Sequence, residues 1–301
     1  MNEDKLQKSG FVSIVGRPNV GKSTLLNRVL GQKIAITSDK PQTTRNRILG
    51  IHTVPEGQVL FLDTPGIHRP QGRLNKYMVD QALNACTGVD LVFFLVEATD
   101  KPGGGDKFVM DVLRQSGIPV FLVINKVDLV KRESLLPLID FYAQQFDFAE
   151  IVPVSAASGE GVERLVASAI KYLPAGPYYY PEDMVTDLPE RFIVAEMIRE
   201  QLLRQTHDEI PYGVAVEVER FEEKPEKELV VIGAVIHVER DAHKRIVLGK
   251  NGSRIRAIGQ SARHELERFL DSRVYLDLFV HVQKNWTDSS GQLRRFGYEN
   301  E

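Results

Sequence analysis

A glycine-rich segment near the amino terminus has the residue types and spacing that bind phosphate. Its members follow one another as Gly16, Arg17, Pro18, Asn19, Val20, Gly21, Lys22 and Ser23, and Thr24 continues into a helical stretch. The glycines let backbone N–H groups point at phosphate oxygens, the lysine can reach the β- and γ-phosphates, and the serine hydroxyl can ligate Mg²⁺. A glycine turn that binds nothing is the alternative, but the apolar run before the segment and the helix after it favour a nucleotide site.

A second motif consists of Asp63, Thr64, Pro65 and Gly66, directly after the apolar run Val59–Leu62. An aspartate in this place can hold Mg²⁺ through water, and the backbone N–H of the glycine can sense a γ-phosphate. Asp-x-Pro-Gly is also an ordinary turn. The interpretation as a nucleotide-sensing motif therefore depends on the strand that precedes it.

The polar stretch Thr37–Arg45 lies between these two motifs. Such a stretch can fold over a nucleotide when a third phosphate and Mg²⁺ are present, although a plain solvated loop is the alternative. Thr43 or Thr44 would supply a hydroxyl for the metal, and we expect Thr44. The predicted metal ligands are Ser23, Thr44 and Asp63, and the predicted catalytic groups are Lys22, Thr44 and Gly66.

Ile67 follows the second motif, where many regulatory GTPases place a glutamine that orients the attacking water. An aliphatic side chain cannot orient water. We therefore expect slow intrinsic hydrolysis, with the water positioned by backbone groups, by another side chain or by a partner. His68 and Arg69 are nearby candidates.

Base selectivity is predicted from Asn125, Lys126 and Asp128, which follow the apolar run Val120–Ile124. The aspartate carboxylate can accept hydrogen bonds from N1–H and the exocyclic amine of guanine, and adenine offers neither donor. A buried acceptor left unpaired costs enough to discriminate strongly between the bases. The asparagine can bridge base and phosphate loop, the lysine stem can cover the ring, and Ser155 with Ala156 would place a backbone N–H near guanine O6.

The elements that must position these residues are short apolar runs separated by amphipathic stretches. The runs are Phe11–Val15, Val59–Leu62, Leu91–Val96, Val120–Ile124 and Ile151–Val154. Runs without period-two alternation are typical of buried parallel strands, so we expect a doubly wound α/β domain, a P-loop NTPase G domain with a mainly parallel sheet. We assign it to residues 1–173, followed by a proline-rich linker over residues 174–190 and a second domain over residues 191–301.

The second domain has a different pattern. A helix near Arg191–Gln205 precedes an alternating strand around Val214–Val218, a second strand over Leu229–Val238, two helices and a last strand over Val274–Val282. The order is α-β-β-α-α-β. Between the two consecutive helices stand Gly249, Lys250, Asn251 and Gly252. In KH domains a Gly-x-x-Gly turn in this place clamps the backbone of single-stranded nucleotides, so we expect an α+β KH domain of the second type.

Charge in the region around this turn favours an RNA partner. Arg240 to Arg268 holds eight lysines or arginines against three acidic residues, a local charge of +5 in a chain of net charge −3. We expect Arg254 and Arg256, with the four residues of the turn, to contact RNA. A helix with a solvated basic face is the alternative. Trp286, Phe296 and Tyr298 could stack on bases or pack the end of the domain.

Composition bounds the class of protein. Apolar residues make up 43% and charged residues 26%, which is typical of a globular chain. Cys86 is the single cysteine, so no internal disulfide forms, and its apolar neighbours predict a core position. The first ten residues contain no apolar run of a signal peptide, and we find no run long enough to cross a membrane. These features predict a cytoplasmic protein.

These motifs together resemble the Era GTPases of bacteria, which join one G domain to one KH domain of the second type. The match covers nearly the whole chain, and the pairing is more specific than either half. The resemblance implies GTP and GDP as ligands with Mg²⁺, binding to the 3′ end of small-subunit ribosomal RNA, and a role in maturing the small ribosomal subunit.

The resemblance has two further implications. Asn19 would hold K⁺ near the phosphates together with the Thr37–Arg45 stretch, although a loop-stabilising asparagine is an open alternative. Family members associate peripherally with the cytoplasmic face of the inner membrane, yet this sequence shows no anchor. No long coiled-coil pattern occurs, so we expect a monomer. A constitutive RNA-binding module with a structural nucleotide, and a nucleotide kinase, are the competing functions.

Overall fold

The computed structural model describes residues 7–40, 43–67, 73–206, 210 and 213–298, and the chain divides into two compact units. The first unit is Met1–Ala35, Thr44–Pro70 and Met78–Asp187, and the second is Ile36–Thr43, Gln71–Tyr77 and Leu188–Glu301. The second unit thus includes two segments that lie early in the sequence.

A six-stranded sheet forms the centre of the first unit, in the order β2-β3-β1-β4-β5-β6. Its strands are β1 (Lys8–Gly16), β2 (Ile48–Val54), β3 (Gly57–Asp63), β4 (Leu91–Glu97), β5 (Val120–Asn125) and β6 (Glu150–Pro153). All neighbours pair in parallel except β2 with β3. The five apolar runs correspond to five of these strands. The edge strand β2 was not predicted, because an antiparallel edge with polar His52 and Thr53 lacks a continuous apolar run.

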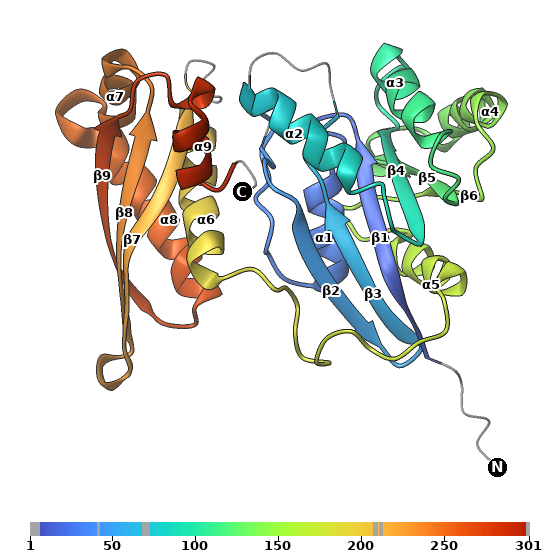
Figure 1. Cartoon of the computed structure of the whole chain (residues 1–301), viewed down its shortest axis with the longest axis horizontal. Coiled ribbons are helices and arrows are strands. Elements are labelled where there is room, and N and C mark those ends of the chain that lie inside the picture. The colour runs from blue at the N-terminus through green and yellow to red at the C-terminus, as the bar shows by residue number, and fades with distance from the viewer. Residues whose placement is uncertain (1–6, 41–42, 68–72, 207–209, 211–212, 299–301) are drawn as a thin grey trace. The chain divides into compact units, whose positions relative to one another are not determined.

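Helices cover both faces of this sheet (Figure 1). They are α1 (Lys22–Leu30), α2 (Arg73–Asn84), α3 (Gly104–Leu113), α4 (Leu135–Gln145) and α5 (Val162–Tyr172). Ala82 of α2, Met110 of α3 and Tyr142 of α4 pack in one cluster with sheet residues, and α1 and α5 contact each other and the opposite face. Cys86 is buried in the first cluster, where burial raises the pKa of its thiol to about 11. The cysteine is therefore a core residue.

Residues 173–189, between α5 and the next helix, contain no helix and no extended strand. Much of this segment is nevertheless attached to the first unit. The side-chain oxygen of Gln58 accepts from the N–H groups of Tyr179 and Tyr180, and the Thr186 hydroxyl donates to Leu49 O over 2.6 Å. The prolines of this stretch remove regular structure but not hydrogen bonding.

The second unit contains a three-stranded sheet in the order β7-β8-β9. Its elements are α6 (Glu190–Gln205), β7 (Val214–Lys224), β8 (Leu229–Val238), α7 (Asp241–Leu248), α8 (Ser253–Phe269), β9 (Arg273–Val282) and α9 (Ser290–Arg295). β7 and β8 are antiparallel, and β8 and β9 are parallel. Ile198 of α6 and Ile258 of α8 pack on the inward residues of the sheet. The predicted α-β-β-α-α-β order of a KH domain is confirmed.

No helix within the described residues combines the length and the apolar character needed to span a bilayer.

Candidate functional site

The phosphate loop connects β1 to α1, and its shape requires glycine at two positions. Gly21 caps the amino terminus of α1 with φ +98°, and a Cβ atom there would lie 2.2 Å from Asn125 Nδ2. A Cβ atom on Gly16 would lie 2.4 Å from Leu95 O. Asn19 also has a left-handed backbone, with φ 65°. The loop therefore brings its backbone close to two neighbouring strands.

Lys22 crosses this loop from the first turn of α1. Its ammonium donates to Arg17 O over 3.0 Å and to Gly16 O over 3.3 Å, and the side chain is buried. Burial lowers the pKa of Lys22 to about 8, while the nearby Asp63 carboxylate acts in the opposite direction. The charged nitrogen is thus held against the backbone of the loop, where phosphate oxygens would compete with the two carbonyls.

Three oxygen-bearing side chains meet next to the loop. Ser23 Oγ lies 2.9 Å from Thr44 Oγ1 and donates to Asp63 Oδ2 over 2.6 Å. The other oxygen of Asp63, Oδ1, is buried and has no hydrogen-bond partner among the described residues. Burial raises the pKa of Asp63 to about 6, against the opposing effects of Lys22, Ser23 and the Thr64 backbone. Hard oxygen ligands and a carboxylate oxygen without a partner fit Mg²⁺.

Thr43 does not reach this cluster. Its hydroxyl donates to Lys40 O over 2.7 Å, whereas the next residue, Thr44, is the one whose hydroxyl meets Ser23. Of the two threonines, Thr44 is the one that lies beside Ser23, which in turn contacts Asp63.

The turn after β3 packs directly on the phosphate loop. A Cβ atom on Gly66 would lie 2.7 Å from Pro18 N, so no side chain fits there. The Thr64 hydroxyl donates to Ile14 O over 2.8 Å, and Pro65 is buried. The Ile67 N–H donates to Gly16 O over 3.1 Å while its side chain enters the core. His68 and Arg69 lie outside the described residues.

The predicted base-binding residues lie at the carboxyl ends of β5 and β6. Asn125 is buried, donates from Nδ2 to Val20 O over 2.8 Å and accepts the Ala156 N–H over 2.9 Å. Ser155 is buried, and Asp128 is exposed at the surface of this edge. Asn125 therefore ties the phosphate loop to the loop after β6, and Asp128 lies open to solvent at the same edge.

The sequence did not predict three ion pairs that support the site. Lys126 is paired with Glu97, the last residue of β4, and Arg17 forms ion pairs of 2.8 Å with Asp100 and with the buried Asp106. The side chain of Arg17 thus points to α3, and its backbone carbonyl meets Lys22. Glu97 directly follows an apolar run, so its place at this edge of the sheet could have been predicted. Nothing in the spacing of Asp106 indicated an ion pair with the phosphate loop.

The Gly-x-x-Gly turn joins α7 to α8. Gly249, Asn251 and Gly252 all have positive φ, of 69°, 52° and 74°. Lys250 is exposed on the turn. Arg256 folds back to donate to Asn251 O and Gly252 O, over 2.7 Å and 3.1 Å, and Arg254 donates to Ile246 O over 2.9 Å. Arg256 therefore braces the turn, and Arg254 ties the start of α8 to α7.

A groove of about 470 Å³ lies between α8 and β9. Ile255, Leu276 and Leu278 give it an apolar floor, and Arg256 and Arg263 line it. Apolar surface with flanking arginines suits unstacked bases and their phosphates. Trp286 and Tyr298 do not contribute ring faces to such a surface, because they are 0% and 5% exposed and pack the end of the unit.

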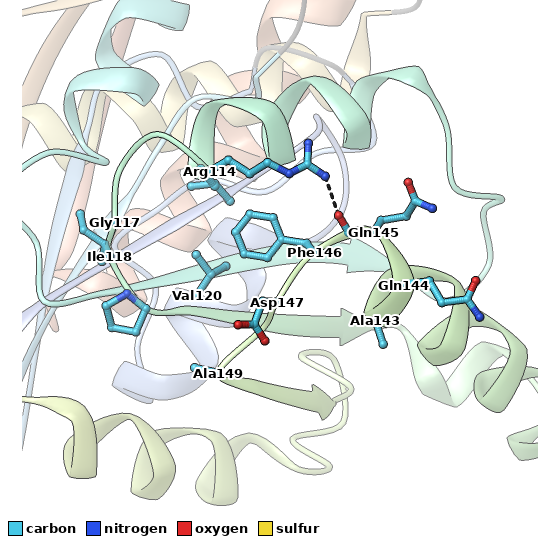
Figure 2. Close-up of a pocket in the computed structure, with 12 residues that line it drawn as sticks. Arg114, Gly117, Ile118, Val120, Ala143, Gln144, Gln145, Phe146, Asp147 and Ala149 are labelled. Atoms are coloured by element: carbon cyan, nitrogen blue, oxygen red, sulfur yellow. Dashed lines mark hydrogen bonds between the residues drawn. The ribbon is translucent and has the colours of Figure 1, made fainter.

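A cavity of about 720 Å³ lies at the other end of the first sheet, near the start of β5 (Figure 2). Arg114 donates to Gln145 O there, and its guanidinium lies 5.9 Å from the centre of the Phe146 ring. Ligands of open α/β sheets bind at the carboxyl ends of the strands. This cavity is at the amino end of β5 and contains none of the predicted site residues.

Comparisons with known families agree with this geometry. Residues 11–126 match the family model described as 50S ribosome-binding GTPase, and residues 209–287 match that of the KH domain. The chain is 58% identical to GTPase Era of Geotalea uraniireducens, over 98% of this chain and 99% of that protein. It is 56% identical to GTPase Era of Geobacter metallireducens, over 97% of this chain and 98% of that protein.

Two solved structures match both units together. One is an Aquifex aeolicus Era variant bound to GDP and AlF4⁻, with a TM-score of 0.94 and 40% identity over 98% of this chain and 100% of that one. Era in complex with MgGDPNP and nucleotides 1506–1542 of 16S ribosomal RNA matches with the same values. Identity this high over nearly the full length leaves no other family to consider, and the chain is a GTPase of the Era family.

Proposed function

We propose that this GTPase binds the 3′ end of small-subunit ribosomal RNA through its KH turn and acts in the assembly of the small ribosomal subunit. The observation that carries the proposal is the Era complex with 16S ribosomal RNA, which shares the fold of this chain at 40% identity. The positive φ angles of Gly249 and Gly252 and the adjoining groove support it, since they give RNA phosphates close access to the backbone.

For the nucleotide, we assign the phosphates to the loop from Gly16 to Thr24. Ser23, Thr44 and Asp63 would hold Mg²⁺, which when bound neutralises charge on the β- and γ-phosphate oxygens. Lys22 exchanges its two carbonyl partners for the same oxygens, and the N–H of Gly66 faces the γ-phosphate. The support for these roles is the 2.6–2.9 Å spacing of the three oxygen ligands and the buried carboxylate oxygen beside them.

For the base, Asp128 accepts from guanine N1–H and the exocyclic amine, and Lys126 covers the ring. Asn125 keeps the phosphate loop and the Ser155–Ala156 backbone at a fixed spacing through its two hydrogen bonds. Guanine is preferred because adenine lacks the two donors that the carboxylate requires.

For the RNA, Lys250 and Asn251 at the tip of the turn approach the phosphates, with Arg254 and Arg256 adding positive charge. We place the protein in the cytoplasm as a monomer. Association with the inner membrane surface and a K⁺ ion held by Asn19 remain predictions of the family resemblance.

The decisive experiment measures GTP hydrolysis by the purified chain with and without an RNA that carries the 3′ sequence of small-subunit ribosomal RNA, in potassium and in sodium. A scrambled RNA of equal length is the control. We expect the specific RNA to stimulate hydrolysis, and potassium to support it better than sodium. Tight RNA binding without any effect on hydrolysis, and no effect of nucleotide on RNA affinity, would instead favour a constitutive RNA-binding module.

A further inference from the structure

The segment Ile36–Thr43 belongs to the second unit, and helix α6 holds it near both ends. At its start, the Thr37 N–H donates to Glu200 Oε1 over 2.9 Å and the Thr37 hydroxyl donates to the same oxygen over 3.2 Å. At its end, Thr43 O accepts from Arg199 Nη2. The next residue along the chain is Thr44, whose hydroxyl meets Ser23 in the predicted Mg²⁺ site.

These contacts come from a group of charged residues on one side of α6, here named the α6 charge cluster: Glu196, Arg199, Glu200 and Arg204. Arg199 Nε lies 2.7 Å from Glu196 Oε1, and Arg204 Nη2 lies 2.8 Å from Glu200 Oε1. Arg199 and Glu200 are both 0% exposed. Buried charges depend on their partners, because an uncompensated one is strongly destabilising. The ion pairs within the cluster therefore hold Arg199 and Glu200 in place, so that both can bind the segment.

The same helix is attached to α8, which starts at the Gly-x-x-Gly turn. Gln201 Nε2 donates to Glu265 Oε1 over 2.8 Å, and Gln205 Nε2 donates to Ser261 Oγ over 3.1 Å. Apolar residues of α6 and α8 also share one core. A displacement of α6 is thus transmitted to the helix that carries the RNA-binding turn.

We propose that the α6 charge cluster is the positioning element that couples the nucleotide site to RNA binding, with Arg199 and Glu200 sensing the segment that leads to Thr44. Consecutive Cα atoms are about 3.8 Å apart, so a shift of Thr44 moves the Thr43 carbonyl with it. A bound nucleotide that changes the position of Thr44 then changes the contacts of α6. The two nucleotide states therefore differ in their interaction free energy with α6, as coupling requires. This inference rests on the proposed function and names the residues that perform the coupling.

The test measures RNA affinity of the full chain with GDP and with GDPNP, using the ribosomal 3′ sequence, and takes the ratio of the two Kd values as the coupling. Glu200→Ala removes the acceptor for Thr37, and we expect the ratio to move towards one by about fivefold or more. The effect of RNA on GDPNP affinity must shrink by the same factor, because coupling is reciprocal. Glu200→Gln keeps an acceptor oxygen and should retain most of the coupling.

The matched control is Glu222→Ala, which removes an ion pair with Arg220 on β7 in the same unit, where both side chains are about half exposed. It should leave the ratio unchanged. If Glu200→Ala couples as strongly as the wild type, the inference is wrong while the proposed function stands. If the wild-type ratio is already one, the nucleotide does not control RNA binding and the inference falls with that part of the function.

A thermal melt shows whether Glu200→Ala is folded. If it is not, Thr37→Val replaces it as the test, because it removes only the hydroxyl bond to Glu200 and leaves the buried carboxylate its other partners. We then expect a change of about twofold in the same direction. An unchanged ratio in folded Thr37→Val would contradict the role of this contact.

Discussion

Asn125 connects the phosphate loop to the loop after β6, and Asn125→Ala tests whether nucleotide binding needs this connection. Its side chain donates to Val20 O over 2.8 Å and accepts the Ala156 N–H over 2.9 Å. Because it is 2% exposed, alanine would leave both backbone partners buried without a replacement. Both loops would then lose the bond that fixes their spacing.

The expected loss of stability follows from the two backbone groups that lose their partner, Val20 O and the Ala156 N–H. A buried hydrogen-bonding group without its partner costs about 1–3 kcal/mol, so Asn125→Ala should lower the free energy of unfolding of the first unit by about 2–4 kcal/mol once water reaches part of the vacated space. If about 2 kcal/mol of this loss also weakens the nucleotide complex, GDP and GTP bind roughly 30-fold more weakly.

The assay is a titration with a fluorescent GDP analogue, combined with urea unfolding followed by circular dichroism. Asn84→Ala is the matched control, because Asn84 is exposed at the end of α2 in the same unit. It should change stability by no more than about 0.5 kcal/mol. A nucleotide affinity of Asn125→Ala within twofold of the wild type would refute the reasoning, since the loops would keep their spacing without the bridge.

Three further predictions concern the base, the RNA and the metal. Asp128→Asn should shift preference from guanine towards xanthine nucleotides in competition titrations, and unchanged preference removes Asp128 from the base site. Gly252→Asp should weaken binding of the ribosomal 3′ RNA by at least about tenfold with GTP affinity intact, unlike Gly117→Asp, a glycine of similar φ (+67°) with nothing nearby. The pKa of Asp63, raised to about 6, predicts that Mg²⁺-dependent GTP binding weakens about tenfold by pH 5, because protons compete with the metal. Asp63→Asn should abolish that dependence, and a flat profile in the wild type would contradict it.

The raised pKa of Asp63 also makes the stability of the metal-free protein depend on pH. Its folded pKa of about 6 exceeds the ordinary value of 3.8, so the folded state binds more protons than the unfolded state between these two pH values. The stability contribution of this group is therefore favourable at low pH and is lost as the pH rises through about 6. Metal binding and stability of the metal-free protein thus change in opposite directions over the same range.

The buried parallel strands could be predicted because each is a continuous apolar run. β4 shows why: its six apolar residues Leu91–Val96 are all buried between helices on both faces. β2 could not be predicted in the same way, because Gly50 interrupts its apolar residues and polar His52 and Thr53 follow them. A Cβ atom there would lie 2.5 Å from Leu26 Cδ1, so the glycine makes room for a helix and the cause lies in packing.

The motifs predicted which residues meet at the candidate nucleotide site but not the contacts that support them. Lys22, Ser23 and Asp63 belong to patterns with a regular spacing, and their meeting at one sheet edge follows from parallel strands. The partners of Arg17, by contrast, are carboxylates on and just before α3. Such pairs depend on the tertiary arrangement of loops, for which one sequence gives no periodic signal.

Ile67 shows how the fold limits the chemistry of this site. Its side chain is 1% exposed within the core, and its N–H donates to Gly16 O, so the position holds the turn against the phosphate loop. A glutamine side chain there would bury an amide in apolar surroundings, which costs free energy unless partners are present. The group that orients the attacking water must therefore come from another position or from a partner. Slow hydrolysis by the isolated protein is then an expected consequence of one buried side chain.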